Sequence, residues 1–590
     1  MKKKLYQYAA AAAAAMSILF AAACGGTSAG TGTTAPAYTQ EAAASGEASE
    51  NIQPAAIEVT TLEDAFSDSD VKDVTAETAD AVITLSGSEG TISDTTRGSS
   101  GSTVTISSKG IYTVTGSSED VTILVNDETE SGTIYLVLDN VSMTNSVAPC
   151  IEVDAADKVV IQCVGENTLT YNGPESAKLD GAVYAKDDLT VNGSGTLTIT
   201  STLHGIVAKN DLKVTGAKIA IEAAKIGIQA GDSVRIGGGE TTIVSGHDGV
   251  QLENDEGTSY FYMEDGSLTI DAGYDGIDVD TSGTAFSGNI TFAGGSADIT
   301  AGGGAENAKT STSQKGLKCA GDIYIGNAGL TISSADDAFH SGTNVYISDG
   351  VTQVSSSDDG VHADAVLAIS GGTLVVSKSY EGLEAETVSI SGGDVSVYAS
   401  DDGINAAGGS DTSSSGDDRW NSASTGALYI SGGTVYVNSG GDGLDSNGSI
   451  YVSGGVTFVE GPTNSGNGAL DKGDGSGSVL SITGGTVVAA GSAGMAVNFD
   501  SGSQCSALVT LSGSAGDVIS ADDGSGVSFT ATKSFQTVVY SSPDLQQGSS
   551  YTLSAGADSA TMDFTSSLYY GNAQGMGNMG GHGGMNNFGK

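Results

Sequence analysis

A short block of the form Asp-Gly followed by an apolar residue recurs through the middle of the chain, at spacings of 22 or 21 residues in its regular runs. It appears as DGVQL, DGIDV, DAFHS, DGVHA, EGLEA, DGINA and DGLDS. A fixed period of roughly 20 to 50 residues is typical of stacked units, because each unit buries its apolar face only against its neighbours. The second residues of the blocks are Gly205, Gly227 and Gly249 in one run, and Ala338, Gly360, Gly382 and Gly403 in another.

Two short strands around a Gly-Gly turn follow the later blocks. They occupy residues 367–376, 388–397, 428–437 and 480–489, and in each the apolar and polar residues alternate. Alternation turns one set of side chains inward, and the glycine pair allows backbone angles that other residues resist. Three short strands per coil predict an all-β chain folded as a right-handed parallel β-helix with about 22 residues per coil. A β-propeller is disfavoured, because its blades need about 40 to 50 residues each.

Both ends of the repeat carry further strand patterns. Residues 80–175 keep the alternation with a weaker repeat, and we expect them to form the first coils. The segment KSFQTVVYSSPDLQQGSSYTLS follows the last coil. We expect this segment to pair with or cap that coil, because an open sheet edge invites aggregation.

The charge of the chain excludes some classes of partner. It has 71 Asp and Glu against 22 Lys and Arg, a formal net charge of −49. Such a chain repels nucleic acid and anionic membrane surfaces, so we predict no nucleic-acid partner. It attracts divalent cations instead, and an anionic ligand approaches only if cations bridge the two sets of carboxylates.

The N-terminus predicts export. Three lysines precede an apolar run from Tyr8 to Ala23, which is too short for a comfortable transmembrane helix. The run ends in small residues directly before Cys24, which resembles a bacterial lipoprotein signal, although Ala21 stands where Leu is commoner. The resemblance implies lipidation of Cys24 and a location on the extracellular face of the bacterial cell membrane. Ordinary cleaved secretion is the alternative.

These patterns divide the chain into four parts. We predict a signal peptide over 1–23, a flexible low-complexity linker over 24–75, the β-helix over 76–565 and a disordered Gly/Met/Asn-rich tail over 566–590. No CxxC pattern favours a zinc site. Cys150 and Cys163 either pair across neighbouring coils or remain as buried free thiols.

The repeated block also predicts which side chains leave the core. Its third and fifth residues should point inward and its fourth and sixth outward. The inward third positions are Val250, Ile277, Phe339, Val361, Leu383, Ile404 and Leu444. The outward fourth positions are Gln251, Asp278, Lys318, His340, His362, Glu384, Asn405 and Asp445. The acidic first positions are Asp248, Asp275, Asp337, Asp359, Glu381, Asp402 and Asp442, several of them preceded by a second acid as at Asp336, Asp358 and Asp401.

Stacked carboxylates of this kind need compensation. Two unit charges about 4.8 Å apart repel by roughly 3–4 kcal/mol at an effective dielectric constant near 20. Ca²⁺ suits such files, because it accepts six to eight oxygen ligands in flexible geometry. We therefore expect calcium sites along this face, with Asp275, Asp278, Asp442 and Asp445 among the candidates, and a solvated acidic turn as the alternative. His340 and His362 stack one coil apart, as a transition-metal pair or as a solvated ladder.

The coils DDAFHS, DDGVHAD, YEGLEAE and DDGINAA, with their ISGG-type turns, resemble a family of bacterial carbohydrate-binding domains. The family is typified by a clostridial cell-surface protein that binds polygalacturonic acid and cellulose, and its fold is a right-handed β-helix with bound calcium, related to pectate lyases. The resemblance covers residues 76–560. It implies calcium-dependent recognition of acidic polysaccharide without cleavage. By position, the calcium-binding acids of the family fall on Asp336, Asp337, Asp358, Asp359, Glu381, Asp401 and Asp402.

Aromatic and basic residues near the acidic file are candidate ligand contacts. Tyr274, Tyr380 and Trp420 are candidates for stacking on sugar rings, with packing along the file as the alternative for the two tyrosines. Lys318 is a candidate base for a calcium-dependent polysaccharide lyase, which is one rival function. A structural or adhesive surface protein stabilised by calcium is the other. An isolated lysine beside acids is more often their charge partner, so a non-catalytic binder is favoured.

Overall fold

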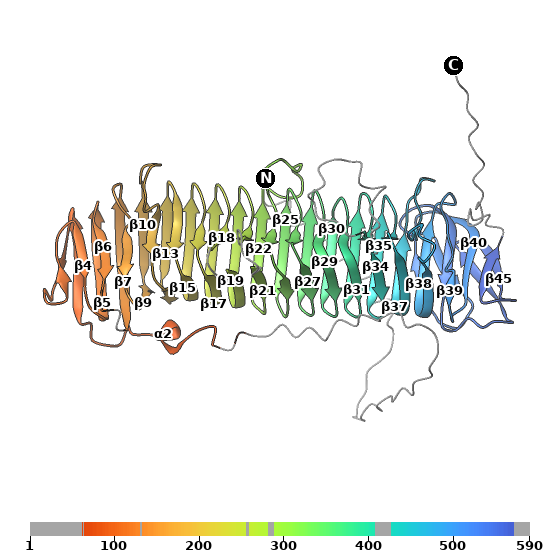
Figure 1. Ribbon diagram of the computed structural model, residues 1–590, viewed down its shortest axis with the longest axis horizontal. Coiled ribbons are helices and arrows are strands. Elements are labelled where there is room, and N and C mark those ends of the chain that lie inside the picture. Colours follow the sequence, from red (N-terminus) through yellow and green to blue (C-terminus); the bar gives the residue numbers. More distant parts are fainter. Residues whose placement is uncertain are drawn as a thin grey trace, which may run out of the picture.

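The protein is an elongated rod in the computed structural model shown in Figure 1. The structure describes residues 62–571, apart from 63, 130–131, 255–258, 281–287 and 408–425. Within these residues nearly all regular structure is strand, and the one helix is the single turn α2 (Asp68–Val71), so the predicted all-β class is confirmed. None of the helical structure in the described part is long and apolar enough to cross a membrane. The predicted signal peptide, Cys24, Trp420 and residues 572–590 of the predicted tail lie outside the described residues. The tail was predicted to be disordered from residue 566, but its residues Leu568–Gly571 form a strand.

The strands of the rod form three stacks, in which each strand pairs in parallel with its equivalents in the neighbouring coils. The first stack contains β11 (Gly181–Ala185), β14 (His204–Ala208), β16 (Ile228–Ala230), β18 (Val250–Glu253), β20 (Ile277–Asp280), β23 (Leu317–Cys319), β26 (Phe339–Ser341), β33 (Ile404–Ala406) and β36 (Leu444–Ser446). The second contains β12 (Leu189–Gly193), β21 (Asn289–Phe292), β24 (Ile323–Ile325), β27 (Asn344–Ile347) and β34 (Ala427–Ile430). β29 (Val361–Ile369) and β31 (Leu383–Ile390) run through both of these stacks.

The third stack contains β10 (Glu166–Tyr171), β13 (Thr196–Ser201), β22 (Ser296–Ala301), β25 (Gly329–Ser334), β28 (Val351–Ser356), β30 (Thr373–Lys378), β32 (Asp394–Ala399) and β35 (Thr434–Ser439). Five long strands run through the second and third stacks: β15 (Asp211–Ala223), β17 (Ser233–Ser245), β19 (Tyr260–Ala272), β37 (Ser449–Glu460) and β38 (Leu480–Gly491). The early coils are formed by β1 (Ala81–Gly87), β2 (Glu89–Ile92), β3 (Gly98–Ser99), β4 (Thr103–Ile106), β5 (Gly110–Glu119), β6 (Thr122–Asn126), β7 (Thr133–Asn145), β8 (Ile151–Ala155) and β9 (Lys158–Val164).

The register places equivalent residues of the repeat directly over one another. Val250 pairs with Ile277, and Phe339 pairs with Val361. All seven side chains predicted to point inward are buried, in one continuous core that runs from Ala81 to Val539. The predicted alternation is therefore confirmed.

The glycine of each Asp-Gly block lies in a tight contact between coils. The backbone N–H of Gly382 donates to the carbonyl of Asp402 in the next coil, at 3.0 Å. A Cβ at Gly382 would lie 2.2 Å from the carbonyl oxygen of Gly403. The recurrence of glycine follows from this close approach of two backbones rather than from an unusual φ angle.

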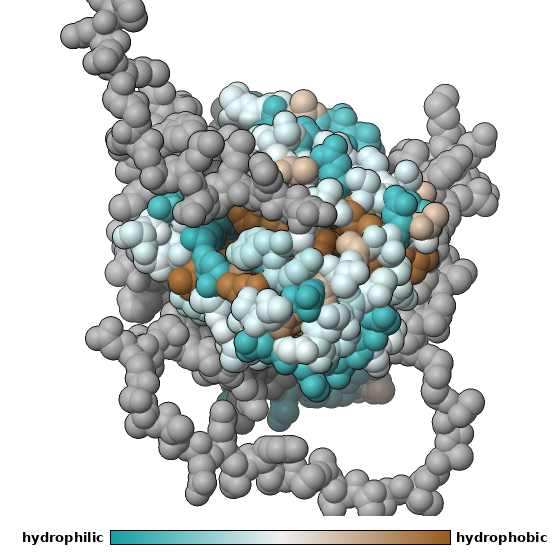
Figure 2. Space-filling model, turned by 90° about the vertical axis from the view of Figure 1, so that its right-hand side faces the viewer, coloured by the Kyte–Doolittle hydropathy of each residue, from teal (hydrophilic) through white to brown (hydrophobic). Residues whose placement is uncertain are grey.

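The C-terminal end of the rod is capped. β43 (Phe535–Ser541) pairs antiparallel with the last long strand, β38, as the sequence predicted, and also with β40 (Ser506–Gly513). A four-stranded sheet of β41 (Val518–Ala521), β42 (Ser528–Thr530), β44 (Ser550–Ala555) and β45 (Asp558–Asp563) packs over a second apolar core. The remaining strands are β39 (Ser501–Gly502) and β46 (Leu568–Gly571). Figure 2 looks onto this end, where white and teal residues surround a narrower band of brown residues.

The N-terminal residues of the described chain lie along the rod. The buried Asp70 of α2 contacts Lys158 of β9 at 3.0 Å and accepts a hydrogen bond from Thr190 of β12 at 2.6 Å. Arg235 donates to the carbonyl of Ala65 at 3.1 Å. Residues 64–75, which the sequence assigned to the flexible linker, therefore pack on the second stack.

The cysteines of the rod are reduced. Cys150 and Cys163 are buried free thiols, so the second of the two sequence-based alternatives is confirmed for this pair. Burial raises the pKa of each thiol to about 12, which keeps both in the unreactive protonated form.

Candidate cation-binding site

Two rows of side chains run along one edge of the first stack. The strand row consists of the outward fourth positions, and consecutive members face one another in parallel register: Gln251, Asp278, Lys318, His340, His362, Glu384, Asn405 and Asp445. The turn row consists of the residues directly before the glycine, or Ala338, of each block. The backbone carbonyl of each accepts a hydrogen bond from the N–H of the equivalent glycine or alanine in the preceding coil: Asp248, Asp275, Lys315, Asp337, Asp359, Glu381, Asp402 and Asp442. Together we call these the acidic file. The predicted stacking is confirmed.

The file is more buried than a solvated stripe would be. Asp278, Asn405 and His362 are 7%, 7% and 1% exposed, because the stacked side chains cover one another. Desolvation of this kind penalises any uncompensated charge. Each buried carboxylate of the file therefore needs a nearby positive charge, hydrogen-bond donors or a bound proton.

At the N-terminal end of the file, the ammonium group of Lys318 supplies positive charge to Asp275 and Asp278. Its ammonium lies 3.0 Å from Asp278 Oδ2 and 3.6 Å from Asp275 Oδ2. Asp275 also accepts hydrogen bonds from the Lys315 backbone and the Ser313 hydroxyl, at 2.7 and 2.8 Å. Burial raises the pKa of Asp278 to about 7, and its second oxygen has no hydrogen-bond partner.

In the middle of the file, two lysines lie among the predicted calcium ligands Asp336, Asp337 and Asp358. The Lys315 ammonium contacts Asp337 and lies 3.1 Å from Asp336 Oδ1. The Lys309 ammonium contacts Asp358 and lies 3.0 Å from the same Asp336 oxygen. These three carboxylates form a group with metal-ligand spacing, but the lysines already supply its positive charge.

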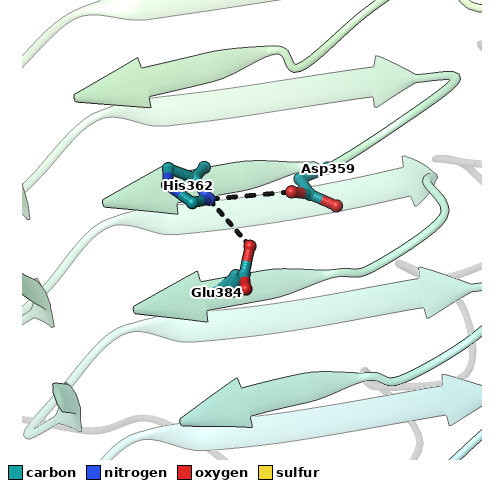
Figure 3. A group of neighbouring side chains, drawn as sticks. All are labelled: Asp359, His362 and Glu384. Carbon is teal, nitrogen blue, oxygen red and sulfur yellow. Dashed lines mark hydrogen bonds and ion pairs between the residues drawn. The ribbon is translucent and has the colours of Figure 1, made fainter. Parts of the chain in front are cut away.

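The next coils bring together Asp359, His362 and Glu384, drawn in Figure 3. His362 Nδ1 lies 2.7 Å from Glu384 Oε2 and 3.7 Å from Asp359 Oδ2. The His340 ring stacks on His362 with centroids 4.8 Å apart, and its Nδ1 lies 3.0 Å from Asp337 Oδ2. The predicted histidine stack is thus present, and each ring faces carboxylates. These contacts raise the pKa of His362 well above its usual range, against the opposing effect of burial.

The C-terminal end of the file consists of carboxylates that crowd one another. Burial, reinforced by neighbouring acids, raises the pKa of Glu381 to about 8, of Asp442 to about 7 and of Asp445 to about 8. In the described chain, no ion pair joins any of these three to a Lys, Arg or His. We call the following set the C-terminal carboxylate group: Glu381, Asp401, Asp402, Asp442, Asp445 and Asp471.

Asn405 adds a neutral oxygen to this group. It occupies the strand row between Glu384 and Asp445. Its amide nitrogen donates to Glu381 Oε2 at 2.8 Å, while its Oδ1 is buried and has no hydrogen-bond partner. A buried unpaired oxygen beside several carboxylates is the donor chemistry of a hard-cation site.

The two tyrosines predicted to contact sugar are partly exposed beside the file. Tyr274 is 38% exposed and stacks on His247, with ring centroids 4.6 Å apart. Tyr380 is 39% exposed.

Sequence reasoning noted Lys315 beside the acidic residues without placing it in the turn row, and it overlooked two further participants. Lys315 occupies an aspartate position of the turn row, so its spacing of 22 residues from Asp337 was an available signal. Lys309 lies in an insert and had no periodic signal. Asp471, which lies in the coil after Asp445 and raises its pKa, falls outside the Asp-Gly pattern.

Comparisons with known proteins identify relatives of the rod. The family described as "Carbohydrate-binding domain-containing protein" matches residues 100–360 and 359–524, which together make up more than half of the chain. A protein of that description from Acetivibrio thermocellus is 36% identical over 129 residues, which are 20% of this chain and 45% of the relative. The chain thus spans less than half the length of that relative.

One solved structure is also similar. It is described as "Structure of the polysaccharide lyase-like protein from C. thermocellum, Gadolinium derivative". It shares 28% identity, covers 42% of this chain and 96% of its own, and superposes with a TM-score of 0.35.

Proposed function

The chain belongs to the family of carbohydrate-binding domain-containing proteins, and from that premise we propose that it binds acidic polysaccharide through Ca²⁺ held by the acidic file. The observation that carries this proposal is the C-terminal carboxylate group. Glu381, Asp442 and Asp445 have raised pKa values because buried acids crowd one another there. A bound cation relieves that repulsion and leaves charge to attract an anionic ligand.

The residues of this group fit calcium. All of their side-chain donors are oxygens, and the unpaired Asn405 Oδ1 adds a neutral ligand. Glu381, Asp402, Asp442, Asp445 and Asn405 would hold the ion, and turn carbonyls would complete its coordination. Asp336, Asp337 and Asp358 fit calcium less well, because binding there requires displacement of Lys309 and Lys315.

The spacing of the coils supports a polymeric ligand. Adjacent coils repeat about every 4.8 Å, which is close to the length of one sugar unit in an extended chain. Calcium bridges carboxylates on the file to carboxylates of a polyuronate. Individual extracellular calcium sites are weak, about 10⁻⁴–10⁻³ M, so affinity comes from several contacts along one chain. The exposed Tyr274 and Tyr380 supply ring surface at the edge of the file.

We assign the rod to the right-handed parallel β-helices. Its three stacks of parallel strands with coil-by-coil register support this assignment. Parallel strands joined by crossovers connect with a right hand in almost every known case. A rigid rod of this kind keeps successive cation sites in line.

We also propose that the rod stands on the extracellular face of a bacterial membrane, lipid-anchored at Cys24. The signal-like segment before Cys24 supports this placement. Residues 24–61 would then serve as the tether, since residues 64–75 pack on the rod.

Binding without cleavage is the activity we favour. A lyase needs a lysine or arginine available as a base, and Lys318 lies between two carboxylates that it neutralises. Within the described residues the arginines are Arg97 and Arg235, which are paired with Asp80 and Asp211 away from the file. Lys318 is therefore a charge partner of the acids.

The test is retention on insoluble polygalacturonate and, separately, on cellulose, in millimolar Ca²⁺ or in EDTA. We expect retention on polygalacturonate in Ca²⁺ and its loss in EDTA. The double variant Asp442→Asn/Asp445→Asn should weaken binding at least tenfold, while Glu240→Gln, which removes an exposed carboxylate far from the file, should not. Retention in EDTA, or an unaffected double variant, contradicts the proposal. An ultraviolet-absorbing unsaturated product indicates a lyase instead.

A further inference from the structure

Asp359, His362 and Glu384 form a compact cluster of three potential metal ligands on two adjacent coils (Figure 3). One ligand atom from each residue lies within 4.8 Å of the other two. Two of the separations are 2.7 and 3.7 Å, from His362 Nδ1 to Glu384 Oε2 and to Asp359 Oδ2. Ligands about 2.0–2.1 Å from a tetrahedral ion stand about 3.3 Å apart, so the cluster needs only small adjustments to hold one.

The orientation of the His362 imidazole is set by the contact that its Nε2 atom makes. His362 Nε2 lies 3.2 Å from Asp364 Oδ1, in the same strand, β29. When Nε2 carries a proton it donates to this carboxylate, which leaves Nδ1 to face Glu384 and Asp359. Histidines that bind metals almost always donate their second N–H to a carboxylate, carbonyl or water in this manner.

The charge around His362 also favours a cation of higher valence. Three carboxylates surround a single ring that is 1% exposed, and the ring of His340 stacks on it at 4.8 Å. A protonated His362 supplies one positive charge to these three carboxylates. A divalent ion bound to a neutral His362 supplies two.

We propose that Asp359, His362 and Glu384 bind one divalent transition-metal ion, with Asp364 as the positioning residue for the imidazole. The ion displaces the proton of His362 Nδ1, which passes to solvent. The nitrogen ligand and the few oxygens suit ions such as Zn²⁺ and disfavour Ca²⁺, which prefers six to eight oxygen ligands. The site is independent of the calcium sites and of polysaccharide binding.

The neighbouring group Asp336, Asp337 and Asp358 provides a contrast within the same file. It has the same number of ligand atoms in the same separation range. It has no nitrogen ligand, and Lys309 and Lys315 lie among its carboxylates. The transition metal is therefore assigned to the His362 cluster and not to this group.

The test uses the full chain, purified without a polyhistidine tag and carrying His582→Gln, so that the tail histidine contributes nothing. Equilibrium dialysis against Zn²⁺ in saturating Ca²⁺, read by elemental analysis, should give one bound Zn²⁺ per chain. His362→Gln should lower Zn²⁺ affinity at least 100-fold and Glu384→Gln at least tenfold. Asp364→Asn should lower it about tenfold, as expected for a group that orients a ligand.

Two matched variants serve as controls. His247→Gln removes a histidine that is also stacked on an aromatic ring, and Asp358→Asn removes a carboxylate of the lysine-filled group. Both should keep the wild-type Zn²⁺ affinity. Co²⁺ substitution should give visible absorption that disappears in Glu384→Gln, a variant that disturbs packing less than His362→Gln because the Glu384 side chain is 19% exposed against 1% for His362. Displacement of Zn²⁺ by millimolar Ca²⁺, no bound Zn²⁺, or unchanged affinity in Glu384→Gln would overturn the proposal.

Discussion

His362 Nδ1 lies 2.7 Å from Glu384 Oε2, and the two residues occupy the same register position in neighbouring coils. Lys318 and Asp278 have the same relationship, at 3.0 Å. Three basic residues of the strand row, Lys318, His340 and His362, thus lie in succession between Asp278 and Glu384, and the row ends in Glu384, Asn405 and Asp445. Lysines and histidines therefore face the carboxylates in the middle of the file, whereas no ion pair of the described residues joins Glu381, Asp442 or Asp445 to a basic side chain.

Asp445→Asn should reduce the stabilisation of the C-terminal coils by calcium. A ligand whose free concentration is about 100 times its dissociation constant stabilises the folded state by about 2.7 kcal/mol. In wild-type protein, hydrogen exchange of β33 and β36 should slow accordingly on adding Ca²⁺, and the variant should show less than half of that effect. Exchange of β11 and β14, far from the group, should be insensitive to Ca²⁺. Equal calcium effects in wild type and variant would contradict this prediction.

Lys315→Met should destabilise the coils around Asp336 and Asp337. The change removes the Lys315 ammonium from two buried carboxylates, of which Asp336 keeps Lys309 at 3.0 Å. Breaking a buried pair costs about 3–5 kcal/mol. Millimolar Ca²⁺ should restore part of the loss, because the ion can take the place of the lysine. Hydrogen exchange of β23 and β26 measures the local opening free energy. Lys218→Met, which breaks an exposed pair with Glu240, should cost less than about 1 kcal/mol.

Asp70→Asn should release residues 64–75 from the rod, since Asp70 is buried against Lys158 and Thr190. Hydrogen bonds outweigh burial and hold the pKa of Asp70 well below its ordinary value. Its contribution is therefore fully present above the unfolded-state pKa, about 3.9, and is lost as the pH falls through the lower folded-state pKa. Limited proteolysis of this segment should accelerate below about pH 4 in wild type.

In Asp70→Asn the same segment should already be cleaved rapidly at neutral pH. The increase in cleavage rate should correspond to a loss of about 3 kcal/mol of local stability. The acceleration below pH 4 should largely disappear. Slow cleavage of the variant at neutral pH would show that other contacts hold the segment.

Gly382→Ala should destabilise the coil it belongs to by about 1–3 kcal/mol or more, through overpacking. The added Cβ would meet the Gly403 carbonyl oxygen and Val397 Cγ1, each at 2.2 Å. Gly477→Ala is the matched control, because a Cβ there meets nothing within 4 Å. The midpoint of urea unfolding should fall only for Gly382→Ala. Equal midpoints would mean that the Asp-Gly block is not constrained by the contact between coils.

Which residues stack could be predicted from the sequence alone. A period of 22 residues and strict alternation are local properties, and they were enough to predict the buried Phe339 and the vertical file of Asp278, Lys318, His340 and His362. They were also enough to predict that KSFQTVVYSS would cover the last coil, since an exposed edge has to be paired.

How the charges of the file are neutralised depends on contacts that the repeat does not encode. Lys309 reaches Asp358 from an insert 49 residues earlier in the chain, and Asp70 reaches Thr190 across 120 residues. Neither contact follows from the repeat, because each depends on where a non-periodic segment is folded back onto the rod. The burial of the file also appears only in the tertiary structure. The row was predicted to point outward, but its stacked side chains exclude water from one another, so each charge in it needs a partner.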